Sequence, residues 1–318
     1  MSVIPKRTTF IVADAGEVAR FYREVLGWQV DYDAPLTLSG GIIPGGSSGD
    51  RVRLIIMGRA GAEIGKIGLL EWVAPKLPAA STPTTRVAIG DTVLVADVDD
   101  MQALLRRVTA FPGTSIAVAP VDWSFPAPDG SGDIKLISMN YFDPAGVLHE
   151  VYYRHNRPNP QGYLIRRCTT LAHNNPAAVA FYRDVLGLTV FQDSKLRNQG
   201  MVLPAGDPAR AEGAMMHFTV CKAGDPYIGM IGTLEFLDPA LPVPTNDVWS
   251  LRIGKAIQVA GCEDATQLFA KISAGGVRIT RAPFARAVPK SGGTGETTMI
   301  SMGFVDPAGM VWEVNQRT

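Results

Sequence analysis

Two similar stretches of the chain each place a single glutamate inside a short apolar run. Residues 143–151 contain Glu150, and residues 306–314 contain Glu313. In both stretches Asp-Pro-Ala-Gly forms a turn signal, and the apolar run that follows is typical of a β-strand. A carboxylate in mid-strand is costly to bury unless it faces a cavity, a cation or a hydrogen-bond partner. Glu150 and Glu313 are therefore the first candidates for catalytic residues.

The two stretches belong to a repeat that covers most of the chain. Residues 7–30 and 167–190 share the pattern Arg-x-Thr at their start and Phe-Tyr-Arg-x-Val-Leu-Gly near their end. Residues 137–154 align with residues 300–317 without a gap. Self-similarity of this kind indicates a repeated structural unit. We expect one domain at 1–154, a linker at 155–163 and a second domain at 164–318.

Each half divides again into two modules with the order βαβββ. In the first module residues 8–12 read as a strand, and Asp14 is a helix N-cap candidate. Apolar residues at positions 18, 21, 22 and 25 fit one face of a helix, which Gly27 is placed to end. Strand-like runs follow at 28–32, 52–57 and 68–73. The same order predicts three further helices, which open near Asp97, at Asn174 and at about Asp264.

Four such modules in two tandem pairs resemble the vicinal oxygen chelate superfamily. That group includes glyoxalase I, extradiol dioxygenases, and the fosfomycin and bleomycin resistance proteins. The resemblance rests on Phe-Tyr-Arg-x-Val-Leu-Gly at 21–27 and 181–187, on Val-Ala-Asp-Val-Asp at 95–99, and on both Asp-Pro-Ala-Gly-x-x-x-Glu stretches. It implies an α+β, glyoxalase-like fold in which four modules form two cupped mixed sheets. Modules one and two could share a cup, or modules one and four.

The resemblance also implies where a metal would lie. In the family, metal ligands come from the first strand of a module and from its last strand, where the residue is usually Glu. The last strands offer four candidates, all expected to face the concave side: Glu71, Glu150, Glu235 and Glu313. Counted back from Asp14, Asp97, Asn174 and Gly261, the first-strand positions hold no usual ligand: Arg7, Gly90, Arg167 and Gly254. We expect no tightly bound Fe or Zn, although carboxylates and waters could hold Mg²⁺ or Mn²⁺.

Arg7 and Arg167 could take over the charge of the missing metal. An arginine beside an inward glutamate would form a buried, hydrogen-bonded ion pair. Such a pair could be structural, or it could bind the carboxylate, enolate or phenolate of a substrate. The sequence leaves both alternatives open, and we expect Arg167→Met to lower stability and anion binding together.

Other side chains could complete a site. His173 is in phase with Arg167 if their strand continues, so it is a candidate acid or base. His149, next to Glu150, is expected on the opposite face of its strand. Trp123 and Phe125 could line an apolar substrate pocket. Glycine-rich segments at 38–50, 125–133 and 289–296 could act as lids.

Composition narrows the partners. The 318-residue chain is 46% hydrophobic and 19% charged with zero formal net charge, which is typical of a globular protein and argues against nucleic acid. No apolar run approaches the length of a membrane span, and the N-terminus lacks the apolar core of a signal peptide. The three cysteines favour reduced thiols and a cytoplasmic location. We expect a small-molecule ligand and a monomer, as a pseudo-dimer, or a homodimer.

These observations support an enzyme of the lyase or isomerase type. Its substrate would be a small, oxygenated, partly apolar molecule that passes through an enolate or oxyanion. The alternative is a non-catalytic binding or sequestering protein of the bleomycin-resistance type, which needs no metal. The missing ligands argue against extradiol dioxygenase and glyoxalase I activity.

Overall fold

The computed structural model describes residues 3–78, 88–127, 129–156, 160–199, 212–224, 227–243, 251–289 and 296–317. These residues form 16 strands and 4 helices, and the helices follow the first strand of each of four βαβββ modules. The α+β fold expected from the sequence is confirmed. In the described part of the chain, no helix combines the length and the apolar character needed to cross a membrane.

The four modules follow one another along the chain. The first module contains β1 (Ile4–Val12), α1 (Ala15–Glu24), β2 (Gln29–Thr37), β3 (Arg51–Gly58) and β4 (Lys66–Ala74). The second contains β5 (Thr92–Asp97), α2 (Met101–Ala110), β6 (Ser115–Pro126), β7 (Asp133–Phe142) and β8 (Leu148–Arg154). The third contains β9 (Leu164–Leu171), α3 (Asn175–Asp184), β10 (Thr189–Gln199), β11 (Glu212–Lys222) and β12 (Met230–Asp238). The fourth contains β13 (Ala256–Cys262), α5 (Ala265–Ala274), β14 (Arg278–Pro289), β15 (Glu296–Val305) and β16 (Val311–Arg317).

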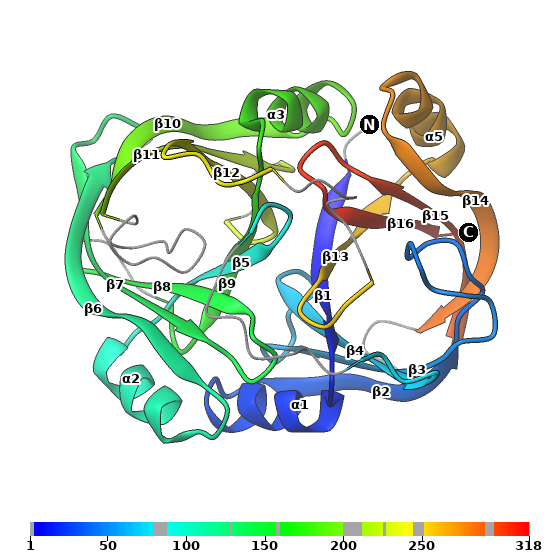
Figure 1. The fold of residues 1–318 in the computed structure, drawn as a ribbon, viewed down its shortest axis with the longest axis horizontal. Coiled ribbons are helices and arrows are strands. Elements are labelled where there is room, and N and C mark those ends of the chain that lie inside the picture. Colours follow the sequence, from blue (N-terminus) through cyan, green and yellow to red (C-terminus); the bar gives the residue numbers. More distant parts are fainter. Residues whose placement is uncertain are drawn as a thin grey trace.

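The strands form two curled eight-stranded sheets that lie side by side (Figure 1). One sheet has the order β14-β15-β16-β13-β1-β4-β3-β2, and we call it the first cup. The other has the order β10-β11-β12-β9-β5-β8-β7-β6, and we call it the second cup. Modules one and four therefore share a cup, as do modules two and three. Antiparallel pairing of β1 with β13, and of β5 with β9, joins the modules within each cup.

The helices cover the outer faces of the sheets (Figure 1). Each begins with an Asx side chain that accepts a hydrogen bond from the backbone N–H three residues on: Asp14, Asp100, Asn174 and Asp264. One large buried apolar cluster takes residues from all four helices and from both sheets. Two smaller clusters fill the inside of the second and the first cup. The cups are thus backed by a common core, and their concave faces remain for ligands.

The Asp-Pro turns that mark the repeat bind the two cups together. Asp143 accepts hydrogen bonds from the backbone of its own turn and from Tyr22 Oη of α1 at 2.9 Å. Asp306 does the same with its own turn and with Tyr182 Oη of α3 at 2.6 Å. Each of these tyrosines lies in the Phe-Tyr-Arg motif of the same half of the chain, in the module that belongs to the other cup. The recurrence of both motifs within the chain therefore has a structural explanation.

Two of the residues used as reference points for the first strands lie three residues before the true helix caps. The second helix is capped by Asp100, whereas Asp97 ends β5 and forms buried ion pairs with Arg154 and Arg166. The fourth helix is capped by Asp264 rather than by the residue at 261. Counting back from the true caps moves the first-strand positions onto Val93 and Ile257.

Gly90 and Gly254, the residues expected at those positions, lie in turns before β5 and β13. Both have positive φ angles, 82° and 88°, which explains why glycine is present there. The first-strand positions of modules two and four are therefore Val93 and Ile257 instead of Gly90 and Gly254. Both are apolar and neither is a metal ligand.

Candidate functional site

Glu313 and Glu150 face the interiors of the two cups, as expected. Along β16 the side chains alternate, so Glu313 and Asn315 line the cavity of the first cup while Trp312 is buried behind the sheet. Glu150 lines the smaller cavity of the second cup. Each cup thus receives one last-strand glutamate.

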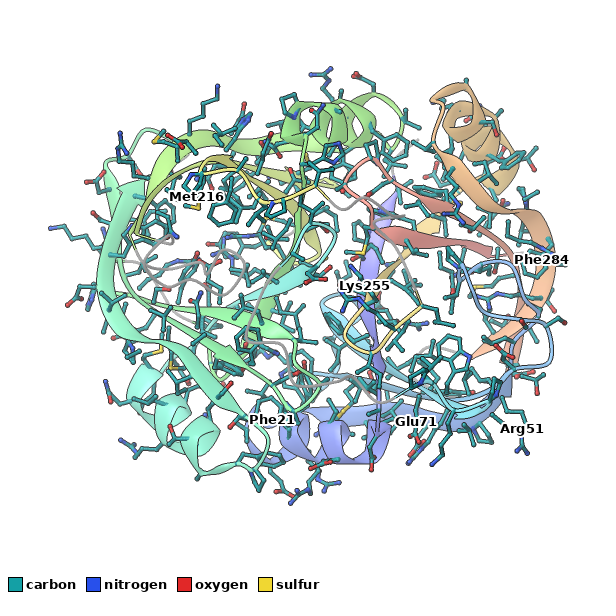
Figure 2. All side chains as sticks on the ribbon, in the orientation of Figure 1. Phe21, Arg51, Glu71, Met216, Lys255 and Phe284 are labelled. Carbon is teal, nitrogen blue, oxygen red and sulfur yellow. The ribbon has the colours of Figure 1, made fainter. Side chains whose placement is uncertain are left out.

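Glu71 and Glu235 lie on the outer face, so the expectation of four inward glutamates is wrong for these two. Glu71 Oε2 accepts a hydrogen bond from the backbone N–H of Ala15 at 3.1 Å, and Figure 2 shows Glu71 beside α1. Glu235 Oε2 accepts one from the backbone N–H of Asn175 at 2.8 Å. Both carboxylates therefore stabilise the first turn of a helix, where backbone N–H groups lack partners. In the fourth module Gln316 takes this place and binds the N–H of Ala265.

Glycine occupies the inward positions of β4 and β12. The strand register pairs Gly68 with Thr9, as it pairs Glu313 with Val259 on β13. A Cβ at Gly68 would lie 2.5 Å from Thr9 Oγ1. Gly232 has the same close relation to Thr169. Modules one and three therefore contribute an arginine to their cups and leave no room for a second inward carboxylate.

The floor of the first cup combines Arg7 with Glu313 and a third charged residue, Arg286 of β14. Arg286 Nη2 lies 2.5 Å from Glu313 Oε1, and their side chains are only 22% and 13% exposed. Arg7 donates its Nε–H to Thr9 Oγ1 at 3.1 Å and lies within the electrostatic reach of both Glu313 and Arg286. The floor thus carries two positive charges and one negative charge.

The two arginines change the pKa of the glutamate between them. Burial alone would raise the pKa of Glu313, but the charges of Arg286 and Arg7, with a hydrogen bond from Asn315, hold that pKa below its ordinary value. Burial also lowers the pKa of the Arg7 guanidinium, opposed by Glu313 and reinforced by Arg286. Glu313 is therefore ionised at neutral pH.

A hydrogen-bonded ring fixes this carboxylate. Arg286 Nε donates to Ser301 Oγ at 2.9 Å, and Ser301 Oγ donates to Asn315 Oδ1. Asn315 Nδ2 donates to Glu313 Oε1 at 2.8 Å, and Arg286 Nη2 closes the ring on the same oxygen. All four residues come from β14, β15 and β16, so a single rigid sheet holds the site.

A cavity of about 650 Å³ opens above this floor. Its walls are mostly aliphatic, from Leu36, Leu38, Ile56, Leu70 and Val259 among others. Segment 38–50 covers one side and reaches the opposite edge of the sheet (Figure 1). There the carbonyl of Ile42 accepts a hydrogen bond from Thr280 Oγ1 of β14 at 2.9 Å. The lid position expected for this segment agrees with its place. Of the other two expected lids, residues 290–295 and 128 lie outside the described residues.

The second cup pairs Arg167 with Glu150, both buried. Tyr152 hydrogen-bonds both of them, and the Arg167 guanidinium lies 4.9 Å from the centre of the Phe218 ring. Burial raises the pKa of Glu150, and Arg167 and Tyr152 oppose this rise. Trp123 and Phe125 line the same cavity, as expected, but its volume is only about 50 Å³.

Corresponding positions in the two repeats explain this difference. Where the first cup has Arg286 and Asn315, the second has Trp123 and Tyr152. Arg286 was missed in the sequence because it belongs to no family motif. A charged residue in phase with the inward side of β14, opposite an aromatic residue in the aligned repeat, was the signal that could have identified it.

The histidines lie outside both cups. His173 is exposed in the turn before α3, because β9 ends at Leu171 and the strand alternation does not reach it. Its expected role as an acid or base inside a cup is therefore wrong. His149 is fully buried on the outer side of its strand, as expected, among Asp143, Tyr22, Tyr141 and Tyr163. His217 contacts Asp193 on the outer side at 2.7 Å.

The residues of either cup do not fit a divalent metal held by protein ligands. Each cup presents one glutamate from a last strand, and in the first cup Glu313 Oε1 already contacts Arg286 and Asn315. Within the described ranges, no group of three or more His, Cys, Asp or Glu residues could hold a metal ion. A site of one carboxylate and several waters remains for Mg²⁺ or Mn²⁺, against the charge of two arginines.

Comparison with known proteins fits this architecture. Residues 165–314 match the family described as Glyoxalase/Bleomycin resistance protein/Dioxygenase superfamily. This half of the chain is a domain of that superfamily. No curated protein sequence matches the chain.

Solved structures show a similar fold over the length of the chain. Glyoxalase I from Zea mays is 14% identical, with a TM-score of 0.62 over 99% of this chain and 92% of that one. A protein of Bacillus subtilis described as a candidate dioxygenase is also 14% identical, with a TM-score of 0.56 over 99% of this chain and 86% of that one. The tandem glyoxalase-like fold expected from the sequence is confirmed.

Proposed function

We propose that this protein binds a small, partly apolar organic anion in the first cup and acts on it as a lyase or isomerase. The observation that carries the proposal is the floor of that cavity, where Arg7 and Arg286 flank a single carboxylate, Glu313. The excess positive charge attracts an anion. The aliphatic walls suit an apolar body, and a cavity of about 650 Å³ is of the size that holds small organic ligands.

Charges at the rim support placing the anion at the floor. Glu63 and Glu296 also line the cavity, but both are exposed to solvent. Lys66 forms an ion pair with Asp31 at 2.7 Å, so these two neutralise each other. Arg7 and Arg286 lie near Glu313 at the floor, where both are partly buried, and attraction is stronger where water is excluded.

The same three residues can support proton transfer. Arg7 and Arg286 would stabilise negative charge that develops on a substrate enolate or oxyanion. Glu313 would accept the proton released in that step. Once a substrate anion shares the arginine charge, the pKa of Glu313 rises, and the carboxylate becomes a better base than in the free protein.

A non-catalytic binding protein is the second candidate. The lowered pKa of Glu313 favours it, because a weakly basic carboxylate is a poor proton acceptor before substrate binds. The superfamily description includes bleomycin resistance alongside glyoxalase and dioxygenase.

We assign a lesser part to the second cup. Arg167 and Glu150 balance each other there, and about 50 Å³ has room for a few water molecules. Trp123 and Phe125 therefore remain proposed contacts for a small group only. A cytoplasmic location and a monomeric or homodimeric state remain part of the proposal.

Calorimetry with 4-phenylbutanoate tests the binding step. Wild-type protein should bind this acid, and Arg7→Met should weaken binding by roughly tenfold or more, since it removes a charge-assisted contact. Arg183→Met is the matched control, because Arg183 is exposed on α3 and pairs with the adjoining Asp184. Absence of binding, or equal loss in the control, would overturn the proposal.

Hydrogen exchange separates the two candidates. Incubation of 2-oxo-4-phenylbutanoate in D₂O should exchange its C3 protons faster with wild-type protein than with Glu313→Gln, measured by proton NMR. Binding without any such acceleration would favour the sequestering protein.

A further inference from the structure

The hydrogen bonds to Glu313 all end on one of its two carboxylate oxygens. Oε1 accepts from both Asn315 Nδ2 and Arg286 Nη2. Oε2 receives no hydrogen bond from any residue that the structure describes. Because Glu313 lines the cavity, this second oxygen is the acceptor available to a ligand.

Ser301 is the residue that makes this arrangement rigid. It is completely buried and accepts from Arg286 Nε while donating to Asn315 Oδ1. The orientation of the Asn315 amide is thereby set, so that its Nδ2 points at Glu313. Rotation of the Glu313 carboxylate would break two hydrogen bonds at once.

The second cup contains the same serine without the ring. Ser138 occupies the position of Ser301, with Tyr152 and Trp123 in place of Asn315 and Arg286. Its Oγ is buried and has no hydrogen-bond partner among the described residues. The ring is therefore a property of the first cup and does not follow from the fold alone.

We infer that Ser301 and Asn315 are positioning residues that hold Glu313 with Oε2 toward the cavity, so that the site prefers anions carrying a proton donor next to the anionic group. The inference rests on the proposed function, which places the anion on Arg7 and Arg286. A carboxylate oxygen without a donor in an apolar cavity favours a ligand that supplies one. The chemical class that does so is a 2-hydroxy acid, or the enol form of a 2-oxo acid, with an apolar substituent.

Two acids that differ by one hydroxyl test this preference. Calorimetry should show 2-hydroxy-4-phenylbutanoate binding wild-type protein roughly tenfold more tightly than 4-phenylbutanoate, the effect of one hydrogen bond to a charged group. In Ser301→Ala and in Asn315→Ala this ratio should fall to about two or less. Ser138→Ala, the same change at the matching position, should keep the wild-type ratio.

The outcomes separate the inference from the proposed function. Failure of both acids to bind would overturn the proposed function and the inference with it. Equal binding of the two acids to wild-type protein would overturn the inference alone. A preserved ratio in Ser301→Ala and Asn315→Ala would show that the ring does not position Glu313. If either variant fails to fold, Glu313→Gln decides, because an amide that keeps the shape of Glu313 must also lower the ratio.

Discussion

Arg286 contacts Glu313 at 2.5 Å in the first cup, whereas the matching residue of the second cup, Trp123, offers Glu150 no charge. Glu313 therefore has two arginines near it and Glu150 has one, Arg167. As a result the pKa of Glu313 lies below its ordinary value, and burial raises that of Glu150. These two glutamates occupy the same place in the repeat, but their surroundings shift their pKa values in opposite directions.

Replacing each glutamate by glutamine should reveal the opposite pKa shifts as opposite trends of stability with pH. A carboxylate with a lowered pKa contributes stability above its ordinary value of 4.5, and loses it as pH falls through the lowered pKa. The stability deficit of Glu313→Gln relative to wild type should therefore shrink as pH falls below about 4.5. A carboxylate with a raised pKa costs stability as pH rises from 4.5 through the raised pKa, so Glu150→Gln should gain relative to wild type over that window.

Urea unfolding between pH 3.5 and 7 measures both effects, with wild type as the reference at each pH. Parallel curves for the two variants would contradict the assignment of different charge environments to the two cups.

Glu71→Ala and Glu235→Ala should each lower the free energy of unfolding by about 1 kcal/mol, because each carboxylate binds an N–H at the start of a helix. Neither change should affect binding of 4-phenylbutanoate, since both residues lie outside the cups. Urea unfolding with calorimetry measures the two quantities together. Loss of binding without loss of stability would contradict this placement and indicate that the two glutamates line a cup.

The fold could be predicted from the sequence because signals for the ends of helices and strands recur in each repeat. Asx caps, glycine ends and Asp-Pro turns recur in each half, and they set the βαβββ order. Which modules share a sheet depends on pairing of β1 with β13 and of β5 with β9, contacts that no local pattern reports.

The site was only partly predictable. Glu150, Glu313, Arg7 and Arg167 were placed correctly in the cups, because strand alternation was read from the right starting point. Glu71 and Glu235 were misplaced because each was aligned with Glu313, whereas Gly68 and Gly232, three residues earlier, occupy that position in the strand register. An error in register by an odd number of residues reverses the face of a side chain.

Purified protein should contain no stoichiometric Fe or Zn. In the first cup the inward positions that could hold ligands are Arg7, Gly68, Ile257 and Glu313, and the last already contacts Arg286. Elemental analysis after chelator-free purification measures the content directly. About one equivalent of either metal per chain would contradict the charge-replacement account.

Thr280→Val should loosen segment 38–50 by removing the hydrogen bond from Oγ1 to the Ile42 carbonyl while keeping the side-chain volume. We expect faster release of a cavity ligand, since the segment covers the first cup, with a change in stability of about 1 kcal/mol. Stopped-flow displacement of a bound fluorescent acid measures the release rate. An unchanged rate for Thr280→Val would show that this contact does not retain the ligand.

The location of a bound anion tests the central claim most directly. A crystal grown with 4-(4-bromophenyl)butanoate would show the bromine by anomalous scattering and the carboxylate by difference density. We predict the carboxylate between Arg7 and Arg286 at the floor of the first cup, with the bromine among the aliphatic side chains of its wall. Density for the acid beside Arg167 in the second cup, or only outside both cups, would contradict the account.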